Sequence, residues 1–217
     1  MTDWARQIES DLNWREAEIG LLKLLAASSV VDSDRQRVLL RALWAVLYAH
    51  YEGFCKFCWD LFLTAIESEG LPRSKLCDQI AKLSLMKIFK ELRGDLSANN
   101  LWDFFHEGLA TQLAEPVTFP LKLETQSNLW ANLAMENNSA VGLSCPLFEQ
   151  FRVQLNSLVN RRNEIAHGKK LVIRSLAAYQ PYEDAAFLAM HELAVAVVDC
   201  LEKRDYLKNA HLAAPVV

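Results

Sequence analysis

One short segment, 158-LVNRRNEIAHG-168, gathers residue types that could act on a phosphate group. A histidine changes its protonation state near neutral pH and can transfer a proton, and an arginine can hold phosphate oxygens with its planar fork of N–H groups. Arg162 and His167 supply this pair, and Asn163 follows the arginine directly. The combination predicts acid–base chemistry on a phosphate-bearing ligand.

Helical spacing decides where these side chains point. At about 100° per residue, Asn163 and His167 lie one turn apart on a polar stripe that also holds Asn156 and Asn160. Arg162 falls instead in the apolar arc, which should face the core, and there a guanidinium must pair with a carboxylate, extend to solvent or line a cleft. The residues of this arc are Phe151, Leu155, Leu158, Val159, Ile165 and Ala166. A regular helix separates Arg162 from His167 by about 140° and 7.5 Å. The two can act on one phosphate only through a second subunit or a distorted last turn.

The same region carries a local excess of positive charge. Residues 151–174 hold six basic residues against Glu164 alone, so their net charge is 6 − 1 = +5, and the remaining chain carries −4 − 5 = −9. Such a run is often only a solvated face. A basic patch around a histidine on an acidic chain nevertheless suits a phosphate-bearing ligand better than indiscriminate binding along a duplex.

The elements that must position this segment are helical, because apolar residues recur with the helical period and no run alternates as a strand would. We expect a first helix over about 3–27 and a second from about 34 to 69, stopped by Gly70 and Pro72. Residues 74–145 predict an irregular stretch of short helices and loops. The first two helices should form a hairpin.

The helix that carries the segment should have Pro146 in its first turn and end near His167, with Gly168 as the left-handed terminating residue. A turn through Gln180–Pro181 should then lead to a last helix over about 182–206. The pattern predicts an all-α antiparallel bundle with an irregular helical insertion in the middle.

Composition favours a single domain over residues 1–217, with about 208–217 as a tail, because 52% of the residues are hydrophobic. The most apolar segment, 38–66, is interrupted by charges too often to span a membrane, and no signal peptide opens the chain. We therefore expect a cytoplasmic protein without a membrane partner. Seven glycines and no glycine-rich motif make a nucleotide-binding loop of the common kinds improbable.

The five cysteines are odd in number and irregularly spaced, which predicts reduced, mostly buried thiols. Cys55 and Cys58 form a C-x-x-C, but they lie within an apolar helix and no second pair completes a zinc site. Core packing is the simpler interpretation. We expect no metal and no cofactor.

Residues 162–167 match the R-N-x-x-x-H form of the R-x(4-6)-H motif, and on this ground the chain resembles the HEPN superfamily of α-helical domains. The segment 48-YAHYEGFCK-56 resembles stand-alone bacterial members of the MAE-like branch, and 127-SNLW-130 is a weaker echo. The resemblance covers most of the chain from Trp14 onward. It implies a HEPN-like bundle that forms a homodimer, in which two motifs face one another across a cleft and cut RNA without metal.

The resemblance also implies a role for each residue. Arg162 would hold the scissile phosphate and stabilise charge in the transition state, and His167 would take the proton from a ribose 2′-OH or deliver one to the leaving oxygen. Asn163 would orient His167 by hydrogen bonding. Supporting roles fall to Arg161, Asn160 and Glu52, and Lys169 and Lys170 would bind RNA phosphates.

These features predict a metal-independent endoribonuclease that serves as a toxin or phage-defence effector, with an antitoxin or defence-system protein as a further partner. The alternative is a non-catalytic HEPN scaffold that binds RNA, a nucleotide or a partner protein. The presence of both Arg162 and His167 favours the enzyme, although fold membership does not settle activity. His50 could support the cleft or the dimer, or be an ordinary polar residue satisfied within the bundle.

Overall fold

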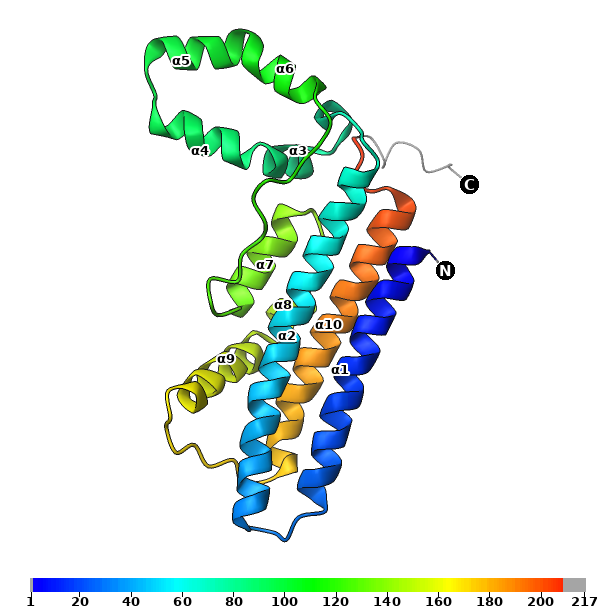
Figure 1. Ribbon diagram of the computed structural model, residues 1–217, viewed down its shortest axis with the longest axis vertical. Coiled ribbons are helices and arrows are strands. Elements are labelled where there is room, and N and C mark those ends of the chain that lie inside the picture. Colours follow the sequence, from blue (N-terminus) through cyan, green and yellow to red (C-terminus); the bar gives the residue numbers. More distant parts are fainter. Residues whose placement is uncertain (1, 209–217) are drawn as a thin grey trace. The chain divides into compact units, whose positions relative to one another are not determined.

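The computed structural model describes residues 2–208, and Figure 1 shows that the chain is built from helices and loops. Within this described range no β-strand forms, and the only β-type pairings are isolated bridges such as Pro72–Pro116. The prediction of an all-α fold is confirmed. The predicted tail at about 208–217 lies outside the described residues, apart from Lys208 itself.

Long helices form most of the fold. The first two predicted helices are confirmed almost to the residue, and Gly70 ends the second hairpin helix with a positive φ of 63°. The long helices are α1 (Asp3–Ala27), α2 (Asp34–Ser68), α9 (Arg152–Ala166) and α10 (Leu176–Lys203). Short elements lie between them: η1 (Arg73–Lys75), α3 (Asp78–Ser84), α4 (Met86–Gly94), α5 (Ala98–Asp103), a π-helical turn (Phe104–Gly108), α6 (Leu109–Ala114), α7 (Ala131–Ala140) and α8 (Leu147–Gln150).

Two boundaries differ from the prediction. The single helix expected from Pro146 to His167 is wrong, because Phe151, with φ −99° and ψ 18°, separates α8 from α9. The turn expected at Gln180–Pro181 is also wrong, since both residues lie inside α10. Helix α10 begins before this proline, because the Ser175 hydroxyl accepts from the Ala178 N–H at 3.2 Å, and it continues through Pro181 although that residue has no backbone N–H to donate.

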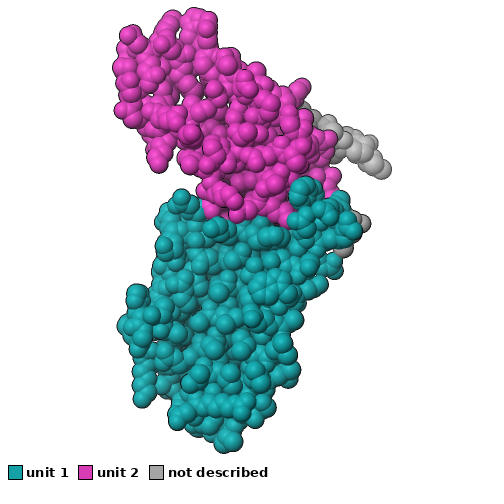
Figure 2. Space-filling model, in the orientation of Figure 1, with its two compact units in different colours: residues 1–58, 124–136, 145–195 teal, residues 59–123, 137–144, 196–217 magenta. Residues whose placement is uncertain are grey.

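The structure divides into two compact units, which Figure 2 shows in different colours. Unit 1 comprises residues 1–58, 124–136 and 145–195, and unit 2 comprises residues 59–123, 137–144 and 196–217. The chain crosses between the units within α2, α7 and α10, so neither unit is a continuous stretch of sequence. That residues 1–217 form one domain stays a prediction.

The core of unit 1 is formed by buried side chains of α2, α9 and α10. Trp44, which is fully buried, donates its Nε1–H to the Leu158 carbonyl oxygen of α9 at 3.2 Å. An aromatic residue with its polar atom satisfied in this way stabilises a core strongly. Other side chains with no exposed surface are Leu43, Leu47, Phe54, Leu155, Val159, Ala185, Ala189 and Met190.

In unit 1, polar and charged side chains of α1 also contact those of α10. Lys23 of α1 lies 2.6 Å from Glu183 and 3.0 Å from the Gln180 side-chain oxygen. Farther along the same helices, His191 Nε2 lies 2.6 Å from Glu16 Oε1. The Lys23 group lies beside a groove of about 660 Å³ between the two helices.

In unit 2, polar contacts hold together segments that have few buried apolar side chains. None of the residues of α4, α5 and α6 is buried. Arg73 is only 6% exposed and donates to the Ser84 hydroxyl at 3.2 Å, to the Gln112 carbonyl at 3.0 Å and to the Thr118 hydroxyl at 3.1 Å. One guanidinium therefore joins three separate segments of this unit.

In the part of the chain that the structure describes, no helix is long and apolar enough to cross a membrane.

Candidate active site

Arg162 lies near the end of α9, in unit 1, and its guanidinium is held from several sides. Its Cζ lies 4.0 Å from the centre of the Tyr48 ring, and its Nη1 donates to Asn163 Oδ1 at 2.9 Å. Nη2 lies 3.4 Å from the Ser127 carbonyl oxygen and 3.5 Å from Glu52 Oε2. The side chain is 25% exposed, so the guanidinium is partly shielded from solvent, and its pairing with a carboxylate is one of the alternatives that its place in the apolar arc left open.

Helix α2 supplies two of these contacts from one face. Tyr48 and Glu52 are four residues apart, which places them one turn apart on the same side of the helix. Tyr48 is 1% exposed, and burial, assisted by the Glu52 carboxylate, raises the pKa of its phenol to about 12. The phenol is therefore neutral at physiological pH, and its oxygen accepts the Leu129 N–H at 2.9 Å.

Residues 125–131, which we name the strap, supply the remaining contact with Arg162. Gln126 and Ser127 both have left-handed backbone conformations, with φ of 49° and 64°, which residues other than glycine rarely adopt in succession. The strap is bonded to Tyr48 through Leu129 and to α9 through Ala131, whose N–H donates to the Asn156 side-chain oxygen at 3.0 Å. Part of the polar stripe of α9 thus serves to hold the strap.

His167 follows the last residue of α9. Its backbone N–H donates to the Asn163 carbonyl at 2.9 Å, and Gly168 then leaves the helix with φ +74°, as predicted. The His167 side chain is exposed and makes no hydrogen bond or ion pair within residues 2–208. Asn163 lies one turn before His167, but its side-chain oxygen accepts from Arg162.

The last turn of α9 is more open than the predicted arc. Leu155, Leu158 and Val159 are fully buried, as expected, whereas Ile165 is only half-buried. Ala166 is exposed, so its predicted place in the core is wrong. The last turn of α9 therefore extends beyond the core, just before the helix ends at Gly168.

Arg161 is not directed to the same place as Arg162. Its Cζ lies 4.9 Å from the Trp44 ring centre and 5.8 Å from that of Tyr182. These distances are typical of cation–π contacts. Arg161 therefore packs against a separate pair of rings, while Asn160 on the same helix is exposed and its side chain has no hydrogen bond in the described chain.

The two lysines after the helix differ from one another. Lys169 Nζ lies 3.4 Å from Glu164 Oε1, so its charge is partly neutralised within its own segment. Lys170 is exposed and forms no ion pair among the described residues. Of the two, Lys170 is the more available to an incoming anion.

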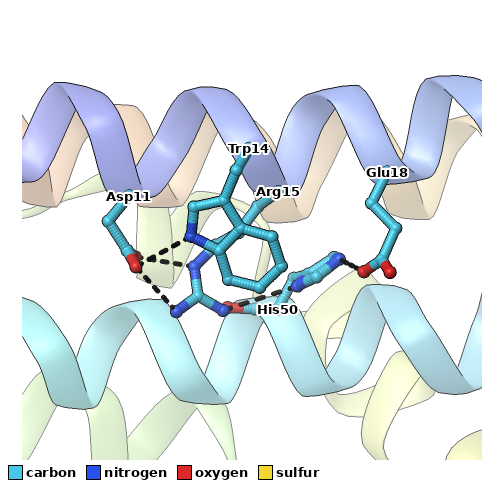
Figure 3. Close-up of polar contacts among 5 residues, drawn as sticks. All are labelled: Asp11, Trp14, Arg15, Glu18 and His50. Atoms are coloured by element: carbon cyan, nitrogen blue, oxygen red, sulfur yellow. Dashed lines mark hydrogen bonds and ion pairs between the residues drawn. The ribbon is translucent and has the colours of Figure 1, made fainter.

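A second polar cluster lies between α1 and α2 in unit 1, and Figure 3 shows its members. Arg15 is 8% exposed, and its guanidinium contacts both oxygens of Asp11, at 2.7 and 3.3 Å, and the Trp14 ring at 4.6 Å. Its Nη1 lies 3.4 Å from His50 Nδ1 and 3.5 Å from the His50 carbonyl oxygen. This buried cation is therefore paired and hydrogen-bonded.

The contacts of His50 assign its tautomer. An arginine can only donate, so Nδ1 must accept from Arg15 and the proton resides on Nε2, which lies 2.8 Å from Glu18 Oε2. Burial, and then the positive charge of Arg15, lower the pKa of His50. His50 is thus neutral and lies within the bundle between Arg15 and Glu18, where its Nε2 is close to the Glu18 carboxylate without a well-aligned hydrogen bond. This agrees with its interpretation as an ordinary polar residue of the bundle, one of the alternatives that the sequence left open.

The segment 48-YAHYEGFCK-56 consequently has two working faces. Tyr48 and Glu52 face the Arg162 site, while His50 and Gly53 face Arg15. Tyr51, between them in the sequence, is buried in the core. One stretch of α2 therefore positions residues on both α9 and α1.

The cysteines follow the structural interpretation. Cys55 and Cys58 are fully buried, and burial raises the pKa of both thiols well above the ordinary value. All five cysteines are free. Residues 2–208 contain no group of three or more His, Cys, Asp or Glu side chains that could hold a metal ion.

Sequence reasoning missed three residues that the structure brings to these clusters. Tyr48 was noticed only as part of a motif, although its spacing of four from Glu52 could have placed it on the same face. Ser127 contacts Arg162 through its backbone carbonyl, so its side-chain type carries no signal. Arg15 was signalled only by Gly53, an isolated glycine inside a helical pattern.

Comparison with known proteins adds one match. A family model described as MAE_28990-like HEPN matches residues 4–206. No curated protein and no solved structure matches the chain.

Proposed function

Since this chain belongs to the MAE_28990-like HEPN family, we propose that it is a metal-independent endoribonuclease that acts as a homodimer. The observation that carries the proposal is the state of Arg162. Its guanidinium is fixed against Tyr48 with a fraction of its surface exposed, and His167 follows five residues later with a free imidazole. Phosphate binding and proton transfer are thereby available at the same end of α9.

The chemistry follows from the two side chains. His167 would remove the proton of a ribose 2′-OH, whose oxygen then attacks the adjacent phosphorus, while Arg162 stabilises the added negative charge. The bond to the 5′-oxygen breaks, and a proton is returned to that oxygen. The products would carry a 2′,3′-cyclic phosphate and a 5′-hydroxyl group, and DNA would remain intact because it lacks the attacking hydroxyl.

Dimerisation completes the proposed site. About 140° of helical rotation separates Arg162 from His167, so the two side chains of one regular helix point in different directions. In a two-fold dimer, Arg162 of one subunit could face His167 of the other across the interface. Two composite sites of this kind would be related by the symmetry axis.

As a biological role we propose a toxin or phage-defence effector in the cytoplasm, controlled by an antitoxin or another defence protein. An unrestrained ribonuclease would damage its own cell, and this is the reason to expect a controlling partner. Lys170 and Arg174, both exposed, would add electrostatic attraction for RNA close to α9.

A non-catalytic HEPN scaffold is the second candidate, and one observation favours it. Both terminal nitrogens of Arg162 already have partners within the chain, namely Asn163, Ser127 and Glu52. A guanidinium used in this way could serve only to join α9, the strap and α2. In that case RNA, a nucleotide or a partner protein would bind without being cleaved.

The deciding experiment is cleavage of a labelled structured RNA in excess EDTA. Arg162→Ala and His167→Ala are compared with Arg152→Ala, an exposed arginine of the same helix, and His191→Ala, an exposed histidine of α10. We expect cyclic-phosphate ends from the wild type and both controls, and a loss of at least about 100-fold in the two site variants. Intact RNA with the folded, dimeric wild type, with and without metal, would favour the scaffold.

A further inference from the structure

We propose that Tyr48 is a positioning residue for Arg162, which holds the guanidinium plane with its ring and the neighbouring strap with its hydroxyl. Its catalytic consequence depends on the proposed ribonuclease function. The positioning itself does not depend on that function and can be measured separately.

The ring of Tyr48 provides a fixed surface for a flexible side chain. An arginine side chain loses much rotamer entropy when it is held in one conformation, so a site that depends on its orientation must restrain it. Tyr48 is 1% exposed, and its ring lies 6.4 Å from that of Tyr51, which is fully buried. The Tyr48 ring therefore cannot move easily, and the guanidinium that lies 4.0 Å from its centre is restrained with it.

The hydroxyl of Tyr48 fixes the strap at a second point. It accepts the N–H of Leu129, a residue with no exposed surface, and Ser127 lies two positions earlier with its carbonyl against Arg162 Nη2. The left-handed conformations of Gln126 and Ser127 form the bend that carries this carbonyl. Tyr48 consequently contacts one face of the Arg162 guanidinium directly, and through the strap it also positions the Ser127 carbonyl at one edge of that group.

This arrangement leaves part of the guanidinium for a ligand. Arginine has five N–H donors, and the contacts on Nη1 and Nη2 engage only some of them. Nε has no hydrogen-bond partner in the described chain. A phosphate approaching the unoccupied edge would meet donors that are already oriented, and such preorganisation is the main source of transition-state stabilisation by charged groups.

Three substitutions separate positioning from simple packing. Tyr48→Phe keeps the ring and removes the hydroxyl, and Tyr48→Leu removes the ring as well. Tyr51→Phe is the matched control, because Tyr51 is buried on the same helix and its hydroxyl has no hydrogen-bond partner in residues 2–208.

The primary measurement is NMR of the arginine side chains, with the Arg162 signals assigned by their loss in Arg162→Lys. In the wild type, Tyr48→Phe and Tyr51→Phe, we expect a ring-shifted Nε–H signal of Arg162. In Tyr48→Leu this signal should move to the position of exposed arginines. An unchanged Arg162 signal in folded Tyr48→Leu would overturn the proposal.

If Tyr48→Leu does not fold, Tyr48→Phe decides through amide hydrogen exchange. Loss of one hydrogen bond worth about 1 kcal/mol should accelerate exchange at Leu129 by about fivefold, and Tyr51→Phe should leave it unchanged. Equal exchange at Leu129 in the wild type and Tyr48→Phe would show that the hydroxyl does not hold the strap.

Kinetics with a cleavable RNA then tests the catalytic consequence. We expect Tyr48→Leu to lower kcat by about 10- to 100-fold, with a smaller change in KM and an unaltered pH profile, because the misplaced group is not the one that transfers protons. A wild type without activity would refute the ribonuclease proposal and leave the NMR result to decide the positioning. A Tyr48→Leu enzyme with wild-type kcat would show that the reaction does not need the restraint.

Discussion

The guanidinium of Arg15 lies directly beside Gly53: a Cβ atom placed on Gly53 would lie 3.0 Å from Arg15 Nη1. A side chain at this position of α2 would therefore press on a nitrogen that also contacts the His50 carbonyl. The absence of a side chain at residue 53 allows the buried cation to reach its partners. The glycine thus has a packing role within the helix rather than a turn-forming one.

This contact makes the effect of Gly53→Ala differ from that of Gly20→Ala. Alanine normally stabilises a helix interior by about 1 kcal/mol over glycine, and no heavy atom lies within 4 Å of the Cβ position at Gly20 in α1. We expect Gly20→Ala to raise the free energy of unfolding by about 0.5–1 kcal/mol, and Gly53→Ala to give no gain or a loss. Urea denaturation measures both, and equal stabilisation by the two substitutions would show that Arg15 yields without penalty.

The neutral state of His50 predicts how stability depends on pH. Burial and Arg15 hold its pKa below the ordinary value of 6.5, so the unfolded chain binds more protons than the folded one just below that pH. The contribution of His50 is complete above about pH 6.5 and is lost as the pH falls below it. Unfolding of the wild type followed between pH 5 and 8 should therefore show stability rising with pH in this window.

Substitution assigns this slope to one residue. His50→Gln should remove that part of the pH dependence, because the variant has no group to protonate beside Arg15. His191→Gln removes an exposed imidazole and should retain it. If the slope between pH 5 and 6.5 is the same in wild type and His50→Gln, other groups cause it.

We expect the buried side chain of Arg73 to contribute strongly to the stability of unit 2. Arg73→Ala removes three side-chain hydrogen bonds that join Ser84, Gln112 and Thr118, and it leaves the buried Ser84 hydroxyl without this donor. We expect a loss of about 2–3 kcal/mol, seen as faster hydrogen exchange throughout α3 and α6. Arg93→Ala, at an exposed position of α4, is the control and should leave these exchange rates unchanged. Unchanged rates in Arg73→Ala would show that the three hydrogen bonds of Arg73 do not stabilise this unit.

Lys169 and Lys170 provide a matched pair for RNA binding. Lys170 has no ion-pair partner in the described range, whereas Lys169 lies next to Glu164. We expect Lys170→Ala to weaken binding of an uncleavable 2′-O-methyl RNA more than Lys169→Ala and to reduce the salt slope by about 1. Fluorescence anisotropy at several salt concentrations measures this, and a salt slope for Lys170→Ala equal to that of the wild type would exclude Lys170 as a phosphate contact.

The composite dimer site can be tested by mixing inactive subunits. A heterodimer of Arg162→Ala and His167→Ala contains one site with both residues intact if each site draws Arg162 from one subunit and His167 from the other. We expect co-refolding of the two variants to restore RNA cleavage to a fraction of the wild-type rate. Persistent inactivity, in a mixture shown to form heterodimers, would mean that both residues must come from one chain.

The sequence predicted the helices well wherever a long apolar pattern had clear ends. The start of α1 at Asp3 and the end of α9 before Gly168 followed from periodicity and from the terminating glycine. The proline-based boundaries were less informative. Pro181 suggested a turn, although α10 continues through it with the loss of one backbone donor.

The candidate site was predictable only in part, for a physical reason. Arg162 was placed correctly in the apolar arc, and a carboxylate partner was one of the alternatives that followed from the cost of burying its charge. Its other partners come from segments distant in the sequence. Ser127 contributes a backbone oxygen and Tyr48 a ring face, and neither kind of contact depends on a spacing that a single helix could reveal.

The contacts that residues 48–56 make on two sides of α2 also restrict the rotation of this helix about its own axis. Leucine and phenylalanine side chains can often be repacked after a small rotation of a helix, because their contacts have little directional preference. Tyr48 and His50 lie about 160° apart around α2, and each is bound to a different neighbouring helix by directional contacts. A rotation of α2 that improved the contacts of Tyr48 would break those of His50, and the reverse also holds. Contacts on opposite sides of α2 therefore fix its rotation about its own axis, and with it the position of the Tyr48 ring against Arg162.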